Sequence, residues 1–121
     1  RWHVRAWCEK NQEYRGFVLS RFRDIPDIMD ESEHGAADDT EYNTEVTIRI
    51  TPDPRLTPAQ QEVIEIDYGM QGGALCITTR GKLVSYALKL LHVNPREQLA
   101  DPMAQKIIVA NRDELEPWLF G

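Results

Sequence analysis

Four basic residues near the N-terminus have the side chains best suited to binding chemistry, namely His3, Arg5, Arg15 and Arg21. A guanidinium presents a rigid fork of N–H donors that matches phosphate and carboxylate oxygens. Burying such a group without a partner costs much free energy. These side chains therefore either point outward at the ends of a sheet or line a pocket that holds an anion or a base.

Recognised catalytic motifs do not accompany these basic residues. The sequence has no phosphate-binding loop, no Gly-x-Ser-x-Gly and no His-Glu-x-x-His. His3 and Cys8 would point to opposite faces of a strand, so they could not ligate one ion. Cys76 falls in an apolar strand, where we expect a small buried hydrophobe. We therefore predict no enzyme activity, no metal and no cofactor.

Two alternating segments must position the basic residues. Residues 2–8 alternate between two faces, and residues 14–22 alternate again, with Arg15 and Arg21 on one face. The polar stretch 9–13 between them predicts a short loop and hence a β-hairpin. An isolated hairpin is marginal in water, and the chain begins at Arg1. We therefore expect a fragment that starts within a small barrel or sheet.

The net charge of -6 over 121 residues argues against nucleic-acid binding by the chain as a whole. The charge is uneven, however: residues 1–23 carry +4, residues 24–45 carry -9 and residues 46–121 carry -1. The basic hairpin thus stays a candidate anion site. The acidic stretch predicts a linker over 26–44, with 30–43 the best candidate for disorder.

Residues 45–121 predict a compact α+β domain. Alternation at 46–50 indicates a strand. Residues 57–60 form a capping-box pattern, which predicts the start of a short helix. Residues 63–68 are predicted to form a strand that pairs with a strand at 74–79. A helix over 82–91, a strand over 106–110 and a final helix after 111 complete the order, while 98–104 is irregular or a short helix. This β-α-β-β-α-β(-α) order predicts a ferredoxin-like fold.

Residues 2–8 (WHVRAWC) and 14–22 (YRGFVLSRF) resemble the core of the WYL domain of bacterial transcriptional regulators. Arg15, Phe17, Leu19 and Arg21 match the R-x-F-x-L-x-R strand of that domain. His3 and Val4 stand where the triad has Tyr and Leu, and a histidine there could titrate near neutral pH. The match covers 1–25 and is most similar to repressors beside anti-phage defence operons (BREX and CBASS). Residues 67–70 and 73–91 resemble the C-terminal extension domain of those regulators.

The resemblance implies the second half of a WYL domain, an Sm-like or SH3-like barrel, over residues 1–25, and the extension domain over 45–121. It implies a homodimeric repressor that binds operator DNA through a winged helix-turn-helix absent from this chain. The implied ligand is a nucleotide or nucleic acid, held by His3, Arg5, Arg15 and Arg21.

Three functions remain open from the sequence. The first is the ligand-sensing and dimerising region of a bacterial transcriptional regulator. The second is a small enzyme on the ferredoxin-like half, and the third is a dimerisation module without a ligand. No apolar run approaches the roughly 18 residues of a membrane span, and two cysteines suit a reducing cytosol, so we expect a cytoplasmic protein.

Overall fold

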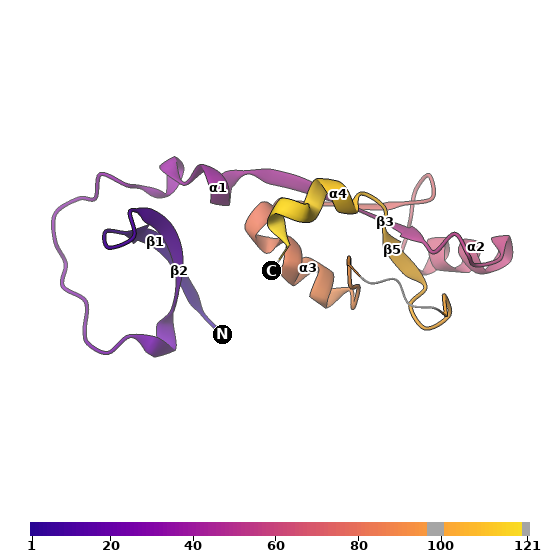
Figure 1. The fold of residues 1–121 in the computed structure, drawn as a ribbon, viewed down its shortest axis with the longest axis horizontal. Coiled ribbons are helices and arrows are strands. Elements are labelled where there is room, and N and C mark those ends of the chain that lie inside the picture. The colour runs from indigo at the N-terminus through magenta and orange to yellow at the C-terminus, as the bar shows by residue number, and fades with distance from the viewer. Residues whose placement is uncertain (97–100, 120–121) are drawn as a thin grey trace. The chain divides into compact units, whose positions relative to one another are not determined.

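The computed structural model describes residues 1–96 and 101–119. The chain divides into two compact units, an N-terminal unit of Arg1–Asn43 and a C-terminal unit of Thr44–Gly121. Each contains one small antiparallel sheet, so the fold is mixed α+β (Figure 1). The acidic segment, expected to be a separate linker, belongs to the N-terminal unit. No helix in the described parts of the chain is long and apolar enough to cross a membrane.

The N-terminal unit is built on the predicted hairpin, which is confirmed. Strands β1 (His3–Cys8) and β2 (Glu13–Val18) pair antiparallel, with Val4 opposite Phe17. The second strand ends four residues before its predicted end, because Leu19–Arg21 forms a 3-10 turn. The last cross-strand hydrogen bond runs from the Leu19 N–H to the carbonyl of Trp2, over 3.1 Å. Arg21 therefore lies outside the strand that was expected to carry it.

The acidic segment returns to the hairpin as the long loop in Figure 1. It contains a 3-10 turn at Ala36–Asp38 and the short helix α1 (Thr40–Asn43), so the prediction of disorder there is wrong. The carboxylate of Asp39 accepts a hydrogen bond from the Tyr42 N–H and so caps α1. This part of the segment is ordered because Asp39 caps α1 and also forms an ion pair with Arg5 of the hairpin.

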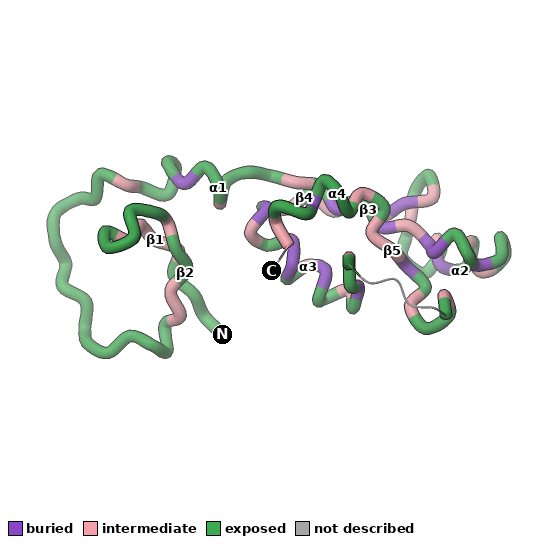
Figure 2. The backbone as a smooth tube through the Cα atoms, viewed as in Figure 1, coloured by how far each residue is buried: buried purple, intermediate pink, exposed green. Residues whose placement is uncertain are grey.

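The C-terminal unit is a three-stranded antiparallel sheet in the order β4-β3-β5. The strands are β3 (Glu45–Pro52), β4 (Leu75–Arg80) and β5 (Ile107–Val109). Three helices accompany them, α2 (Pro58–Asp67), α3 (Val84–Leu90) and α4 (Arg112–Leu115). Figure 2 shows buried residues along β3 and α3, whereas the N-terminal unit is mostly exposed. The hydrophobic core is made by Ile48, Ile50, Leu56, Ile64, Val84, Leu88, Val93, Ile107 and Leu115.

The predicted strand over 63–68 is wrong, because α2 continues through these residues. The predicted capping box is confirmed: the Thr57 hydroxyl accepts from the Gln60 N–H, and the Gln60 side chain accepts from the Thr57 N–H. This cap starts a helix that buries Ile64 in the core. Burial and capping outweigh the small helix penalty of β-branched residues, which is a few tenths of a kcal/mol each.

The described residues of the C-terminal unit therefore follow the order β-α-β-α-β-α, which differs from the ferredoxin-like order. The strand at 75–80, the helix within 82–91 and the strand at 107–109 are confirmed. Cys76 is exposed, so its expected burial is wrong; it lies opposite Arg49 on the polar face of the sheet. Of the expectation for 98–104, residues 98–100 lie outside the described residues, and 101–104 form a turn.

Two polar side chains that follow strands of the C-terminal unit form hydrogen bonds with nearby backbone and side-chain groups. Asp53 is completely buried after β3, and its carboxylate accepts from the Arg55 backbone N–H and guanidinium at 2.8–3.2 Å. Asn111 lies beyond β5, where its side chain accepts from the Arg49 N–H (2.9 Å) and donates to the Thr47 carbonyl (2.7 Å). The Asn111 amide thus continues the hydrogen bonding of β5 along the edge of β3.

Candidate functional site

The hairpin register separates the four predicted binding residues. Paired residues of an antiparallel sheet share a face, and successive residues alternate. His3 and Arg5 therefore lie on one face, whereas Arg15, which pairs with Ala6, lies on the other. Arg21 lies in the 3-10 turn after β2. The structure thus brings His3 and Arg5 to one face and leaves Arg15 and Arg21 elsewhere.

Arg5 is the basic residue with the most complete set of partners in the N-terminal unit. Its Nε and Nη2 atoms donate to the two carboxylate oxygens of Asp39, at 2.7 and 3.1 Å. A carboxylate oxygen of Glu41 is 3.7 Å from Nη2, and the guanidinium carbon lies 5.9 Å from the centre of the Tyr42 ring. The hydrogen bond to Asp39 raises the pKa of Arg5 despite partial burial. Arg5 therefore stays charged and holds a carboxylate in a bidentate geometry.

An aromatic cluster lies beside this ion pair on the same face of the hairpin. The His34 ring stacks on the Trp7 indole with centroids 3.8 Å apart and planes 9° from parallel, and Tyr14 meets Trp7 edge-on at 5.2 Å. The Tyr14 hydroxyl donates to the Gly35 carbonyl over 2.8 Å. These contacts attach residues 34–35 to the hairpin, just before the segment that Asp39 attaches to Arg5.

The ion pair and the aromatic cluster surround a cavity of about 350 Å³. The Trp7 indole Nε1 is buried there, and no hydrogen-bond acceptor reaches it from the described residues. The lining thus offers a guanidinium already paired with a carboxylate and flat aromatic surfaces. An anion that bound Arg5 in this cavity would have to compete with Asp39.

Sequence reasoning missed Trp7, His34 and Asp39 in this cluster. Trp7 shares a face with Arg5, a signal that was available in the alternation of residues 2–8. The strongly acidic composition after a basic hairpin was a second signal, since opposite charges attract. What the sequence did not indicate is which of the nine acidic side chains would reach Arg5.

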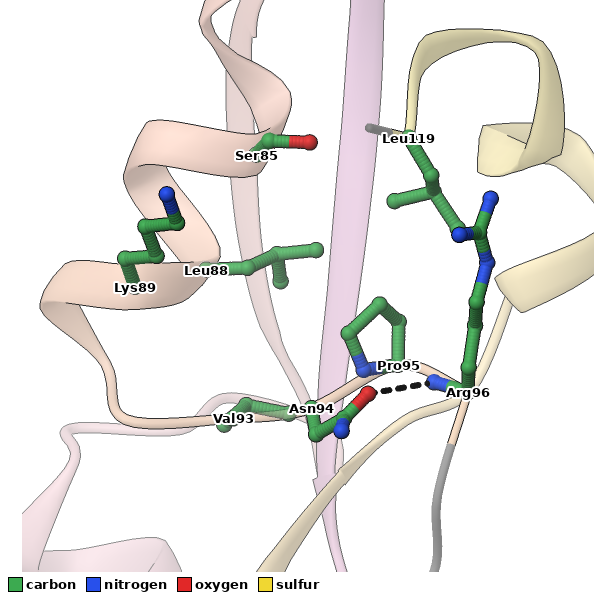
Figure 3. Close-up of a pocket in the computed structure, with 8 residues that line it drawn as sticks. All are labelled: Ser85, Leu88, Lys89, Val93, Asn94, Pro95, Arg96 and Leu119. Carbon is green, nitrogen blue, oxygen red and sulfur yellow. Dashed lines mark hydrogen bonds between the residues drawn. The ribbon is translucent and has the colours of Figure 1, made fainter. Parts of the chain in front are cut away.

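A second cavity, of about 310 Å³, lies in the C-terminal unit (Figure 3). Leu88 on α3 and Leu119 near the C-terminus point into it, and Val93 and Pro95 complete its apolar part. Arg96 donates to Glu116 over 3.1 Å at its edge. This cavity has an apolar interior with charged groups at its rim.

Most of the exposed large apolar side chains in the described part of the C-terminal unit lie on two helices, the others being Tyr68 and Met103. On α2 they are Val63 and Ile66, and on α3 with its preceding turn they are Leu83, Tyr86 and Leu90. Exposed apolar patches commonly mark contact surfaces for other molecules. No group of three or more His, Cys, Asp or Glu side chains in the described parts of the chain is arranged to hold a metal ion.

Comparison with known proteins assigns the class. Residues 45–115 match the family model of the BrxR transcriptional regulator, C-terminal dimerization domain. The matched region covers the sheet and all three helices of the C-terminal unit. The chain belongs to this family.

Curated relatives extend the likeness over the N-terminal unit. A DNA-binding transcriptional repressor CapW from Pseudomonas aeruginosa is 36% identical over 116 residues, which are 96% of this chain and 38% of the relative. CapW from Stenotrophomonas maltophilia is 32% identical over 119 residues, which are 98% of this chain and 40% of the relative. CapW from Escherichia coli strain KTE188 is 36% identical over 115 residues, which are 95% of this chain and 38% of the relative. The chain therefore spans about two fifths of the length of these relatives.

Proposed function

We propose that this chain is the dimerising and ligand-sensing region of a homodimeric bacterial transcriptional repressor. The observation that carries the proposal is the family match over 45–115, which spans the whole sheet of the C-terminal unit. The relatives are DNA-binding repressors, so operator DNA is contacted by other parts of the intact protein. The resemblance of residues 1–25 to regulators beside anti-phage defence operons supports a role in controlling such an operon.

The proposed sensing site is the hairpin, with His3 and Arg5 on one face. Arg15 on the opposite face and Arg21 in the turn after β2 are the other two proposed contacts. The ligand class is an anion with a planar base, such as a nucleotide or a short nucleic acid. The bidentate hold of Arg5 on a carboxylate supports this class, because phosphate offers the same fork of oxygens. In this proposal the ligand displaces Asp39 from Arg5 and thereby frees the acidic segment.

Sedimentation of the 121-residue chain over a range of concentrations tests dimerisation, and a reversible monomer–dimer equilibrium is expected. Thermal unfolding with added nucleotides and short single-stranded oligonucleotides tests sensing. We expect one of these probes to raise the melting temperature, and Arg5→Gln to abolish that rise. Arg15→Gln and Arg21→Gln, tested one at a time, decide whether those residues contribute.

A dimerisation module without a ligand is the second candidate. The observation that favours it is the separation of Arg15 from Arg5 onto opposite faces of the hairpin. A dimer whose melting temperature responds to none of the probes would support this candidate over the first.

A further inference from the structure

We propose that two copies of this chain pair through the outer face of α3. The face is defined by Leu83, Tyr86 and Leu90, which we call the α3 stripe. Their side chains are 40%, 46% and 82% exposed. The inference rests on the proposed dimerisation function and deepens it by naming the surface that the second copy covers.

The α3 stripe runs from Leu83, in the 3-10 turn that precedes α3, to Leu90 at the end of α3. Its members are three and four positions apart, so they lie above one another on the helix surface. The opposite face is fixed by the core, because Val84, Ser85 and Leu88 are buried. The helix therefore has two apolar faces, one covered by the sheet and one exposed, whereas an ordinary surface helix has a single apolar face.

The family match supports a second copy of this chain as the partner that covers the α3 stripe. The matched family is a dimerization domain, and its match over 45–115 includes the whole α3 stripe. Of the other strongly exposed apolar residues, Ile66 on α2 lies inside the match, and those of the N-terminal unit lie outside it, namely Trp2, Ile25, Ile28 and Met29. In a dimer with twofold symmetry the same patch of both copies is in contact. Charged residues on the patch therefore lie near the same charged residues of the second copy and repel them.

Charge separates α3 from α2, the other helix with exposed apolar residues. Glu62, Glu65 and Asp67 surround Val63 and Ile66 on α2, and two such acidic surfaces would repel when brought together. Residues 81–91 contain no carboxylate. Two lysines, Lys82 and Lys89, flank the stripe; their stems are long and flexible, and Lys89 Nζ lies 6.0 Å from the ring centre of Tyr86, which attracts the ammonium. The α3 stripe has more exposed apolar residues and fewer like charges than α2, so it is the better self-contact.

Leu90→Lys tests the surface, with Ile66→Lys as the matched control. Both residues are exposed apolar side chains near the C-terminal end of a helix, 82% and 72% exposed, where an added lysine is tolerated by the folded monomer. Because both copies carry the change, we expect Leu90→Lys to raise the dimer dissociation constant roughly tenfold or more. Ile66→Lys should leave it within about twofold, and Leu90→Ala should weaken the dimer less than Leu90→Lys does.

Sedimentation equilibrium of the 121-residue chain and its variants gives the dissociation constants, and thermal unfolding monitored by circular dichroism checks that each variant is folded. A dimer unaffected by Leu90→Lys would overturn the α3 surface while leaving dimerisation itself intact. A dimer weakened equally by Ile66→Lys would also overturn it, because the contact would then not be specific to α3. An unaltered chain that stays monomeric would instead overturn the proposed dimerisation and the surface with it.

Discussion

Gly81 lies directly against the indole of Trp118: a Cβ at position 81 would be 2.3 Å from Cε3 of that ring. The two residues join the turn before α3 to the segment after α4. The Ser85 hydroxyl reinforces the contact by donating to the Trp118 carbonyl over 3.4 Å. Because Gly81 has no side chain, the Trp118 ring can pack directly against the turn before α3.

Gly81→Ala should destabilise the C-terminal unit, because the new methyl group has no room beside the ring. Overpacking of this kind costs about 1–3 kcal/mol, measurable as a lower denaturation midpoint in urea. Gly16→Ala is the control, since nothing lies within 4 Å of a Cβ there. The double variant Gly81→Ala/Trp118→Ala should lose less free energy of unfolding than the sum of the losses in the two single variants. Full additivity would contradict the proposed clash.

Asp39→Ala should release the acidic segment from the hairpin. The carboxylate of Asp39 is 2% exposed and carries both hydrogen bonds from Arg5, and charged hydrogen bonds contribute about 1.5–3 kcal/mol each. Hydrogen–deuterium exchange of the amides at 36–43 should become faster. Asp30→Ala removes the same charge from an exposed position and should leave exchange unchanged; equal effects of both variants would point to net charge instead.

Asn111→Ala should loosen the edge of β3, because the backbone groups of Thr47 and Arg49 lose their side-chain partner. Because both hydrogen bonds are exposed, water replaces the lost partner, and each bond contributes about 0.5–1.5 kcal/mol, which equilibrium unfolding in urea resolves. Glu114→Ala is the control, since Glu114 accepts only a 3.2 Å bond from the same amide. A Glu114→Ala effect as large as that of Asn111→Ala would argue against the role of Asn111 at the strand.

Tyr14 should make the N-terminal unit sensitive to alkaline pH. Burial raises the pKa of its hydroxyl, and the carboxylates of Asp38 and Asp39 raise it further. The folded chain therefore keeps this proton at a pH where the unfolded chain, with an ordinary pKa of about 10, has lost it. The resulting stabilisation is complete below about pH 10 and disappears as the pH rises through the higher folded pKa.

Comparison of the chain with Tyr14→Phe isolates this titration. The stability difference between the two proteins should be constant below about pH 10 and shrink above it. Trp7 fluorescence during chemical unfolding follows the unit, because Trp7 contacts Tyr14. A stability difference that does not change with pH would show that the Tyr14 proton plays no part.

The sequence by itself determined the elements whose signals are local. The alternation in residues 2–8 specified the hairpin, and Thr57, Pro58 and Gln60 specified the start of α2 through a cap that closes within one turn. The strands predicted at 46–50, 74–79 and 106–110 and the helix predicted at 82–91 correspond to β3, β4, β5 and α3. In each case the deciding interactions connect residues a few positions apart, so the pattern of side chains contains them.

Only the tertiary structure decided the features that join distant residues. Ile64 is helical because its side chain completes a core whose other members come from the sheet and α3. Asp39 meets Arg5 across 34 positions of sequence, and His34 stacks on Trp7, although the acidic composition of 26–44 predicted a linker. Arg15 lies away from Arg5 because the pairing register fixes the face of each side chain. Packing, charge pairing and register depend on contacts between residues that are distant in the sequence. The periodicity of side chains along the sequence therefore does not predict them.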